Sequence, residues 1–331
     1  MDVSTHVLDP EGDVIIVLKK CPEDLFSSST TGSEYRIQAS SKHLTLASAY
    51  FKSILDSKWA EGRSLQDKGT TEINASDFDL EAFIIVMNAV HGRQNKVPRV
   101  ISVDIFSKIA TVVDYYMCHN VVDMCKEVWL HHLKKDLETS IIWDSPNYSI
   151  NHLTIWVWIS WVFGLDEEFR CATHNIAKRH SGIFAPPDIP IPGVVIETIN
   201  NYTWACADGL RTSLDKLLQD LRDGKHGCGF DCQSILYGAL SLEIHRNSLS
   251  VIWGNDCRPQ VSFESLLRQI ESFKSPGRCQ SCRYGYHSTE HCGLKHYIDS
   301  EVLKAAPIIR GLELSSFSCR GGDDAESLFG K

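Results

Sequence analysis

The sequence predicts an α+β fold over residues 1–135, followed by a mostly α-helical domain over 136–317. Strand-like segments occur only before residue 80, and helical apolar periodicity dominates from Trp143 onward. The 331 residues are enough for two ordinary domains, and a hydrophobic fraction of 43% is typical of a substantial core. The end of the chain, residues 318–331, is rich in Gly and Asp and is predicted to be a disordered tail.

Three short segments predict a small sheet. Residues 13–18 form a β-branched run typical of a buried strand. Residues 34–39 alternate polar and apolar side chains, as a strand with one solvated face does, and a loop rich in Ser, Thr and Gly joins the two segments. We therefore expect a hairpin, with a third strand over 71–75.

Helical periodicity predicts the other elements of this first domain. Ser40 and Ser41 are suitable N-caps for a helix whose apolar residues recur from Leu44 to Leu55. Asp77 or Asp79 can cap the next helix, which ends at Gly92. Two further helices are expected over 103–116 and 121–135.

The second domain is expected to consist of helices alone. A Trp-rich helix over 153–163 is apolar on nearly all sides, so it should be buried on more than one side. A proline-broken stretch over 185–192 interrupts the helical pattern. The other helices are predicted over 166–179, 194–200, 212–222, 232–246, 262–273 and 297–314.

Composition excludes several classes of protein. There are 42 acidic and 33 basic side chains, a net charge of −9, which argues against direct nucleic-acid binding. The longest apolar run, residues 153–165, is too short to cross a bilayer, and no secretory signal opens the chain. The twelve cysteines are therefore expected in a reducing compartment, the cytoplasm or the nucleus.

Motifs of the common catalytic folds are missing from the sequence. It has no phosphate-binding G-x4-G-K-[ST] loop, no G-x-S-x-G elbow, no H-E-x-x-H pair and no kinase signature. We therefore predict a non-enzymatic protein.

Five segments of the first domain carry a resemblance to the BTB/POZ fold. The helix Leu44-x3-Ser48-x2-Phe51 matches the family's Leu-x3-Ser-x2-Phe signature, and Val90-His91-Gly92 stands at its "aliphatic-Tyr-Gly" ending. The others are the strands 13–17 and 35–39 and the segment 109–118, which is similar to "Leu-x2-Ala-Asp-x-Tyr". Ser40 stands where most members have His, and His91 replaces Tyr. The whole chain is similar to a fungal lineage of BTB proteins with a helical extension.

The resemblance implies a protein–protein interaction and dimerisation module with protein partners, and hence a homodimer. An alternative is an adaptor of a cullin-type ubiquitin ligase, or a transcription-related regulator, in which the helical half selects the partner. Cullin adaptors carry a hydrophobic-x-Glu motif in the loop equivalent to 92–102, but this loop contains no Glu.

The resemblance also implies a location for the dimer interface. In the family, the acid equivalent to Asp13 lies near that interface and is charge-paired, and Arg36 is the candidate partner here. The predicted interface residues are thus Asp13, Val14, Ile16 and Arg36. The alternative for Asp13 is a solvated turn residue before a strand.

A group of cysteines and histidines in the second domain suggests a structural zinc site. Cys279 and Cys282 form a C-x2-C pair, and Cys228 and Cys232 lie upstream with three residues between them; such tight spacing suits a tetrahedral zinc ion. His291 or Cys292 could substitute for one of the four. Alternatively, these cysteines are small hydrophobic residues, as expected for Cys118, Cys125, Cys171 and Cys206. A redox role for the C-x2-C pair is less expected, because no βαβ pattern precedes it.

Overall fold

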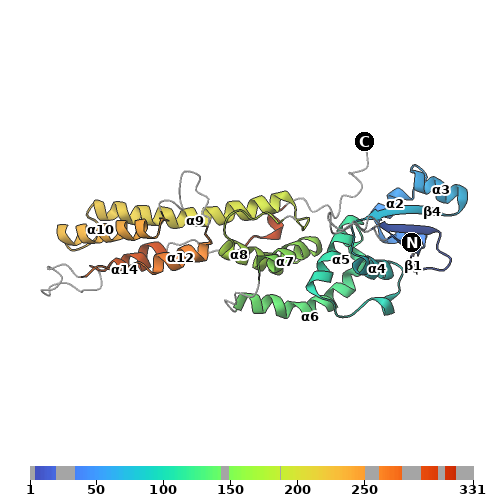
Figure 1. The fold of residues 1–331 in the computed structure, drawn as a ribbon, viewed down its shortest axis with the longest axis horizontal. Coiled ribbons are helices and arrows are strands. Elements are labelled where there is room, and N and C mark those ends of the chain that lie inside the picture. Colours follow the sequence, from blue (N-terminus) through green and yellow to red (C-terminus); the bar gives the residue numbers. More distant parts are fainter. Residues whose placement is uncertain are drawn as a thin grey trace, which may run out of the picture. The chain divides into compact units, whose positions relative to one another are not determined.

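The structure, a computed structural model, divides into two compact units. Figure 1 draws the elements of both. The first unit comprises Met1–Asn147, Ile155–Glu168 and Leu314–Lys331, so it extends past residue 135; the second comprises Tyr148–Thr154 and Phe169–Glu313. The structure describes residues 4–19, 34–142, 149–186, 188–249, 261–277, 292–304 and 310–317, and the predicted tail over 318–331 lies outside them.

A four-stranded sheet begins the first unit. Its strand order is β1-β3-β2-β4, with β2 antiparallel to β3 and parallel to β4, and β1 parallel to β3. The three predicted strands are confirmed, and the antiparallel β2–β3 pair agrees with the predicted hairpin. The strands are β1 (Ser4–Val7), β2 (Val14–Lys19), β3 (Glu34–Ala39) and β4 (Thr71–Ser76).

Helices of the first unit lie both between β3 and β4 and after β4. The predicted helix over 44–55 is divided at Ser48, whose extended backbone ends one helix and whose side chain caps the next. The helix over 60–68 was not predicted from the sequence. The helices are α1 (Ser41–Ala47), α2 (Ala49–Ile54), α3 (Ala60–Lys68), α4 (Leu80–Val90), α5 (Val103–Tyr115) and α6 (Asp123–Ile142), with short 3-10 turns η1 (Gln94–Lys96) and η2 (His119–Val122).

Side-chain caps fix where the central helices begin. The carboxylate of Asp79 accepts a hydrogen bond from the Ala82 N–H, and the hydroxyl of Ser102 accepts one from the Ile105 N–H. Each bond satisfies a backbone donor that has no partner within its own helix. The Asp79 cap expected from the sequence is thus confirmed.

The Trp-rich helix contributes to the first unit from Ile155 onward. It is the C-terminal part of α7 (Ile150–Phe163). Trp158 donates a hydrogen bond from its Nε1 to the Thr111 hydroxyl, at 3.1 Å, and the ring of Phe163 stacks on that of Phe106. Trp156, Val157 and Ile159 are fully buried, as expected for a helix that is apolar on nearly all sides.

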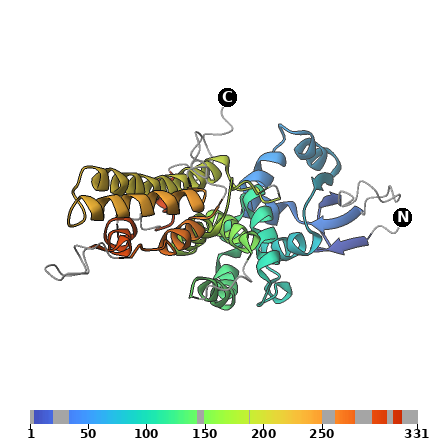
Figure 2. The ribbon, with the colours of Figure 1, turned by 60° about the vertical axis from the view of Figure 1, so that its left-hand side comes forward.

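Long helices build the second unit around one core. Figure 2 shows α9 and α10 running side by side. Leu210, Leu214 and Leu217 of α9 join Leu236 and Leu240 of α10 in that core. The helices are the end of α8 (Asp166–Arg179), α9 (Gly193–Arg222), α10 (Phe230–Arg246), α12 (Phe263–Glu271) and α14 (Leu294–Tyr297), which continues into a π-helical turn, Ile298–Leu303.

Two expectations for this unit were wrong in extent. The helices predicted over 194–200 and 212–222 are parts of one continuous helix, α9, because helical hydrogen bonding persists through Gly209. The helix predicted over 297–314 is helical only as far as Leu303 among the described residues, and residues 310–313 are not helical. From residue 149 onward, the described residues contain no strand, as predicted.

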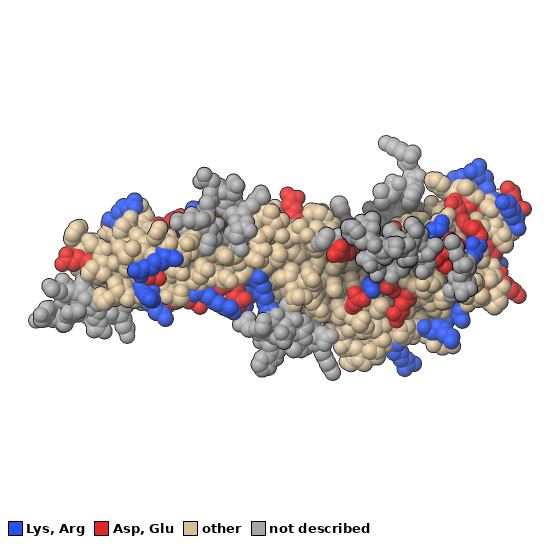
Figure 3. All heavy atoms as spheres, in the orientation of Figure 1, with Lys and Arg blue, Asp and Glu red and all other residues tan. Residues whose placement is uncertain are grey.

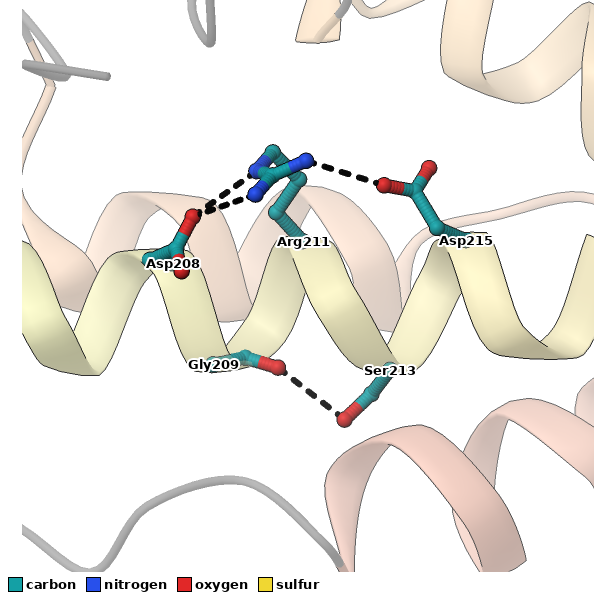
Figure 4. Close-up of polar contacts among 5 residues, drawn as sticks. All are labelled: Asp208, Gly209, Arg211, Ser213 and Asp215. Carbon is teal, nitrogen blue, oxygen red and sulfur yellow. Dashed lines mark hydrogen bonds and ion pairs between the residues drawn. The ribbon is translucent and has the colours of Figure 1, made fainter.

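The solvent face of α9 is stabilised by charge pairs within the helix. Arg211 donates hydrogen bonds to Asp208 at one side and to Asp215 at the other, while the Ser213 hydroxyl bonds to the Gly209 carbonyl (Figure 4). In Figure 3, basic and acidic side chains are interspersed over the face in view. None of the helices in the described residues combines the length and the apolar character needed to cross a membrane.

Candidate interaction surface and metal centre

Asp13 holds the first helix in place. Its carboxylate accepts two hydrogen bonds from Ser41, one from the backbone N–H and one from the hydroxyl, both at 2.7 Å. Arg36 instead pairs with Glu72 and lies 3.8 Å from Glu34. The predicted Asp13–Arg36 pair is therefore wrong.

Strand register explains why that pair does not form. Val14 lies opposite Ala39, and Val17 lies opposite Arg36. Asp13 is thus at the end of β2 nearest the start of α1, and Arg36 is about 13 Å further along the sheet at the usual rise per residue. There it reaches Glu72 on β4, across β2.

Val14 and Ile16 belong to the core of the sheet. Both side chains are fully buried, and β2 is paired on both edges, with β3 and with β4. The structure thus places these two predicted interface residues inside the domain and not on its surface.

The outer edge of β1 is more accessible than the buried side chains of Val14 and Ile16. β1 pairs with β3 on one side and ends the strand order on the other, among the described residues. The Leu8 N–H bonds to the Gln38 carbonyl, so strand alternation directs the N–H groups of Thr5 and Val7 away from β3. Arg93 donates to the Val7 carbonyl at 2.8 Å and anchors the end of this strand. An exposed edge of this kind can pair with a strand of another chain.

An apolar groove lies between the η1 segment and α6. Its volume is about 490 Å³, and its lining includes Val97, Pro98, Met124, Val128 and Trp129. The Trp129 indole donates to the Pro98 carbonyl at 2.7 Å, which fixes the ring, while the Met124 side chain is 84% exposed. Such a groove can accept an apolar segment of a partner. Helical periodicity predicted α6 but gave no signal for the groove, because the other wall comes from the loop before α5.

Three cysteines of the second unit converge on one point. Cys228 lies in the loop between α9 and α10, Cys232 in the first turn of α10, and Cys292 just before α14. Their sulfur atoms all lie within 4.8 Å of one another. Cys232 is buried, Cys292 is half-buried and Cys228 is exposed, so the group extends from the core to the surface.

Three polar contacts hold the loop that carries Cys228. Lys225 bonds to Asp220 at 2.6 Å, His226 lies 3.0 Å from a carboxylate oxygen of Glu301, and the Gly227 N–H donates to the Tyr297 hydroxyl at 3.1 Å. The His226 ring also packs on the Tyr297 ring, at 4.5 Å between centroids. These contacts fix the loop against α9 and against the segment that follows Cys292.

Burial and the neighbouring cysteines disfavour ionisation of the Cys232 thiol when no cation is near. Burial, and then the neighbouring Cys292 and Cys228, raise the pKa of Cys232 to about 12, although a backbone N–H of Cys228 acts in the opposite direction. A bound cation reverses this balance, because it stabilises thiolates directly.

The predicted zinc ligands are therefore placed in part. Cys228 and Cys232 lie together, and Cys292, expected only as a substitute, is the third member. Cys279, Cys282 and His291 lie outside the described residues. Of the cysteines expected as small hydrophobic residues, Cys118 and Cys206 are buried and Cys125 and Cys171 are half-buried.

Comparison with known proteins identifies one domain. Residues 25–133 match the BTB/POZ domain, about a third of the chain, and the match runs through β3 and β4 into α6. No curated protein and no solved structure is significantly similar to the chain. The resemblance stated from the sequence is thus confirmed for this domain, and the fungal lineage stays a prediction.

Proposed function

Because residues 25–133 form a BTB/POZ domain, a type of protein–protein interaction module, we propose that the chain acts non-enzymatically and forms a homodimer through the first unit, which contains this domain. The observation that carries the proposal is the exposed outer edge of β1, which ends the strand order among the described residues. In a two-fold dimer, identical edges meet, so β1 of one copy can pair with β1 of the other.

A second feature supports a surface for a partner in the same unit. The Leu46 side chain on α1 is 89% exposed, and Val7 on β1 is also exposed. Burying a leucine side chain of this kind contributes about 2 kcal/mol, so contacts of this kind would add to the backbone hydrogen bonds of a paired edge.

The test uses a proline on the outer edge of β1. The Thr5→Pro variant removes an N–H that points away from β3, so it should prevent pairing with a second copy and leave the chain's own sheet intact. Thr5→Val is the matched control, because it keeps the N–H. Sedimentation of the full chain should give a dimer for the wild type and for Thr5→Val, and a folded monomer for Thr5→Pro, which melts somewhat earlier because it lacks the stabilisation from association. A Thr5→Pro dimer would contradict pairing through β1.

The apolar groove beside α6 favours a second candidate function. An adaptor or transcription-related regulator needs a site for another protein, and the groove suits an apolar helix or extended segment. We propose that such a partner contacts Met124 and Val128, and that the helical half selects the partner. Affinity capture with wild-type chain and Met124→Glu chain, followed by mass spectrometry, tests this. A cullin that the wild-type chain captures and the Met124→Glu chain does not would support the adaptor. A co-repressor with the same behaviour would support the regulator, and identical sets of captured proteins for the two chains would contradict both.

The proposed place of action is inside the cell, in the cytoplasm or the nucleus. Twelve cysteines, with those of the described residues all as free thiols, suit a reducing compartment. Fluorescence microscopy of the tagged chain would locate it, and export from the cell would contradict this assignment.

A further inference from the structure

We propose that Cys228, Cys232 and Cys292 bind one zinc ion through their thiolates. Zinc accepts sulfur ligands at about 2.3 Å in a tetrahedral arrangement, which separates the sulfur atoms by about 3.8 Å. The three sulfur atoms already lie within 4.8 Å of one another. Side-chain rotations alone can therefore bring them to coordination distance. Binding would release the three thiol protons to solvent.

The backbone around the three cysteines is held before any ion binds. The loop that carries Cys228 is fixed to α9 by Lys225 and Asp220, and to the segment after Cys292 by His226 and Glu301. The Gly227 N–H bonds to Tyr297, five residues after Cys292. A preorganised set of ligands loses little conformational entropy on binding, which favours affinity.

Gly227 lets the loop approach Cys232 closely. Its φ is +85°, a conformation that favours glycine, and a Cβ atom at this position would lie 3.3 Å from the Cys232 sulfur. Glycine at position 227, next to Cys228, thus leaves the Cys232 sulfur unobstructed.

The position of Cys232 on its helix also suits an anionic ligand. Cys232 is the third residue of α10, a 17-residue helix, so unpaired N–H groups of the first turn lie close to it. Its side chain is only 4% exposed. A thiolate bound to zinc at this depth is neutralised by the metal, whereas an isolated thiolate would be costly to bury.

Three thiolates favour zinc over the hard cations. Calcium and magnesium require oxygen ligands, whereas sulfur suits zinc and other soft or borderline metals. The nearby group of Asp220, His226 and Glu301 has a different explanation, because Asp220 is paired with Lys225 and His226 with Glu301. These contacts fix the loop, so we assign the metal to the cysteines.

The first experiment measures metal content and ligand type in the full chain. Protein purified under reducing conditions without chelator should contain close to one zinc per chain by elemental analysis. After removal of zinc, cobalt should replace it and give the visible bands of a tetrahedral site together with a thiolate-to-cobalt charge-transfer band. Protein that neither contains zinc nor gives these bands would overturn the proposal. Copper in place of zinc would also overturn it, as would a Cys228–Cys232 disulfide that persists after purification under reducing conditions.

The second experiment separates the ligands from other cysteines. Cys232→Ser and Cys292→Ser should each release the metal and remove the cobalt charge-transfer band. Cys206→Ser is the matched control, because Cys206 is also buried in this unit but lies outside the group, so this variant should retain the metal even if it melts earlier. The assignment would be overturned if Cys292→Ser kept its full metal content while Cys279→Ser and Cys282→Ser each lost the metal. That result would favour the four cysteines predicted from the sequence, in which Cys279 and Cys282 join Cys228 and Cys232.

Discussion

The imidazole Nε2 of His91 accepts a hydrogen bond from the backbone N–H of Ser40, at 3.0 Å. These are the two positions at which the sequence departs from the BTB/POZ pattern, and they contact each other. The Nδ1 atom of His91 lies 2.8 Å from the Met87 carbonyl, which can only accept, so Nδ1 carries the proton of a neutral ring. A second proton on Nε2 would face the Ser40 N–H and break this contact.

This contact predicts that acid destabilises the domain. Burial lowers the pKa of His91 in the folded chain, and the positive charges of the neighbouring His43 and Arg93 lower it further. The Met87 carbonyl and Asp9 raise this pKa, but the net shift is downward. The unfolded chain then binds the proton more readily, so the contribution of His91 to stability is complete above about pH 6.5 and declines as the pH falls. The free energy of unfolding, measured in urea from about pH 7.5 to about pH 5.5, should decrease.

A non-titrating variant isolates this effect. In His91→Gln the amide oxygen can still accept the Ser40 N–H, but the side chain cannot be protonated, so the unfolding free energy should depend less on pH. His132→Gln changes an exposed histidine of α6 and should keep the wild-type dependence. Equal slopes for wild type and His91→Gln would refute the prediction.

Ser48 joins the start of α2 to the end of α5. Its hydroxyl accepts a hydrogen bond from the Phe51 N–H and donates one to the Tyr116 carbonyl, and the Phe51 and Tyr116 rings stack 4.7 Å apart. Ser48→Ala removes a cap and leaves a buried carbonyl unsatisfied, so it should cost about 2 kcal/mol of unfolding free energy in chemical denaturation. Ser57→Ala, in an exposed turn, should stay within about 0.5 kcal/mol of wild type. A similarly small change for Ser48→Ala would contradict the assigned role.

Gly227→Ala should weaken the proposed metal site. The added methyl group meets the Cys232 sulfur and the Gln233 backbone at 3.3 Å, at a φ that alanine adopts only with strain of about 1 kcal/mol or more. We expect weaker zinc binding in a competition titration with a chromophoric chelator, together with a lower melting temperature.

Gly238→Ala is the matched control for that substitution. Gly238 lies inside α10, and apart from the local backbone of that helix a Cβ atom there meets nothing within 4 Å, so alanine should stabilise the helix by about 0.5–1 kcal/mol and leave zinc affinity unchanged. Equal zinc affinities for Gly227→Ala and Gly238→Ala would contradict the role given to Gly227.

Local pattern was enough to predict most of the first domain. The strands β2, β3 and β4 carry strong β-branched or alternating signals, and Asp79 is an N-cap with a local mechanism. The division of the helix at Ser48 was not predicted, because Ser48 fits the helical periodicity on either side of it. β1 was missed, because four residues with the sequence STHV carry no periodicity and owe their conformation to pairing with β3.

The candidate sites depended more on tertiary contacts. Spacing indicated that Cys228 and Cys232 lie close together, since only three residues separate them in the sequence. Nothing local indicated Cys292 as their third neighbour, because Cys292 is 60 residues after Cys232 in the sequence. For the same reason the sequence could not show that Asp13 binds Ser41 or that Arg36 reaches Glu72, which strand register decides.

Self-association of the full chain tests the central claim most directly. Sedimentation velocity over a concentration series should give a species of twice the chain mass of 37.2 kDa at micromolar concentration, and the chain mass for Thr5→Pro. A wild-type chain that sediments at 37.2 kDa up to tens of micromolar would contradict the homodimer.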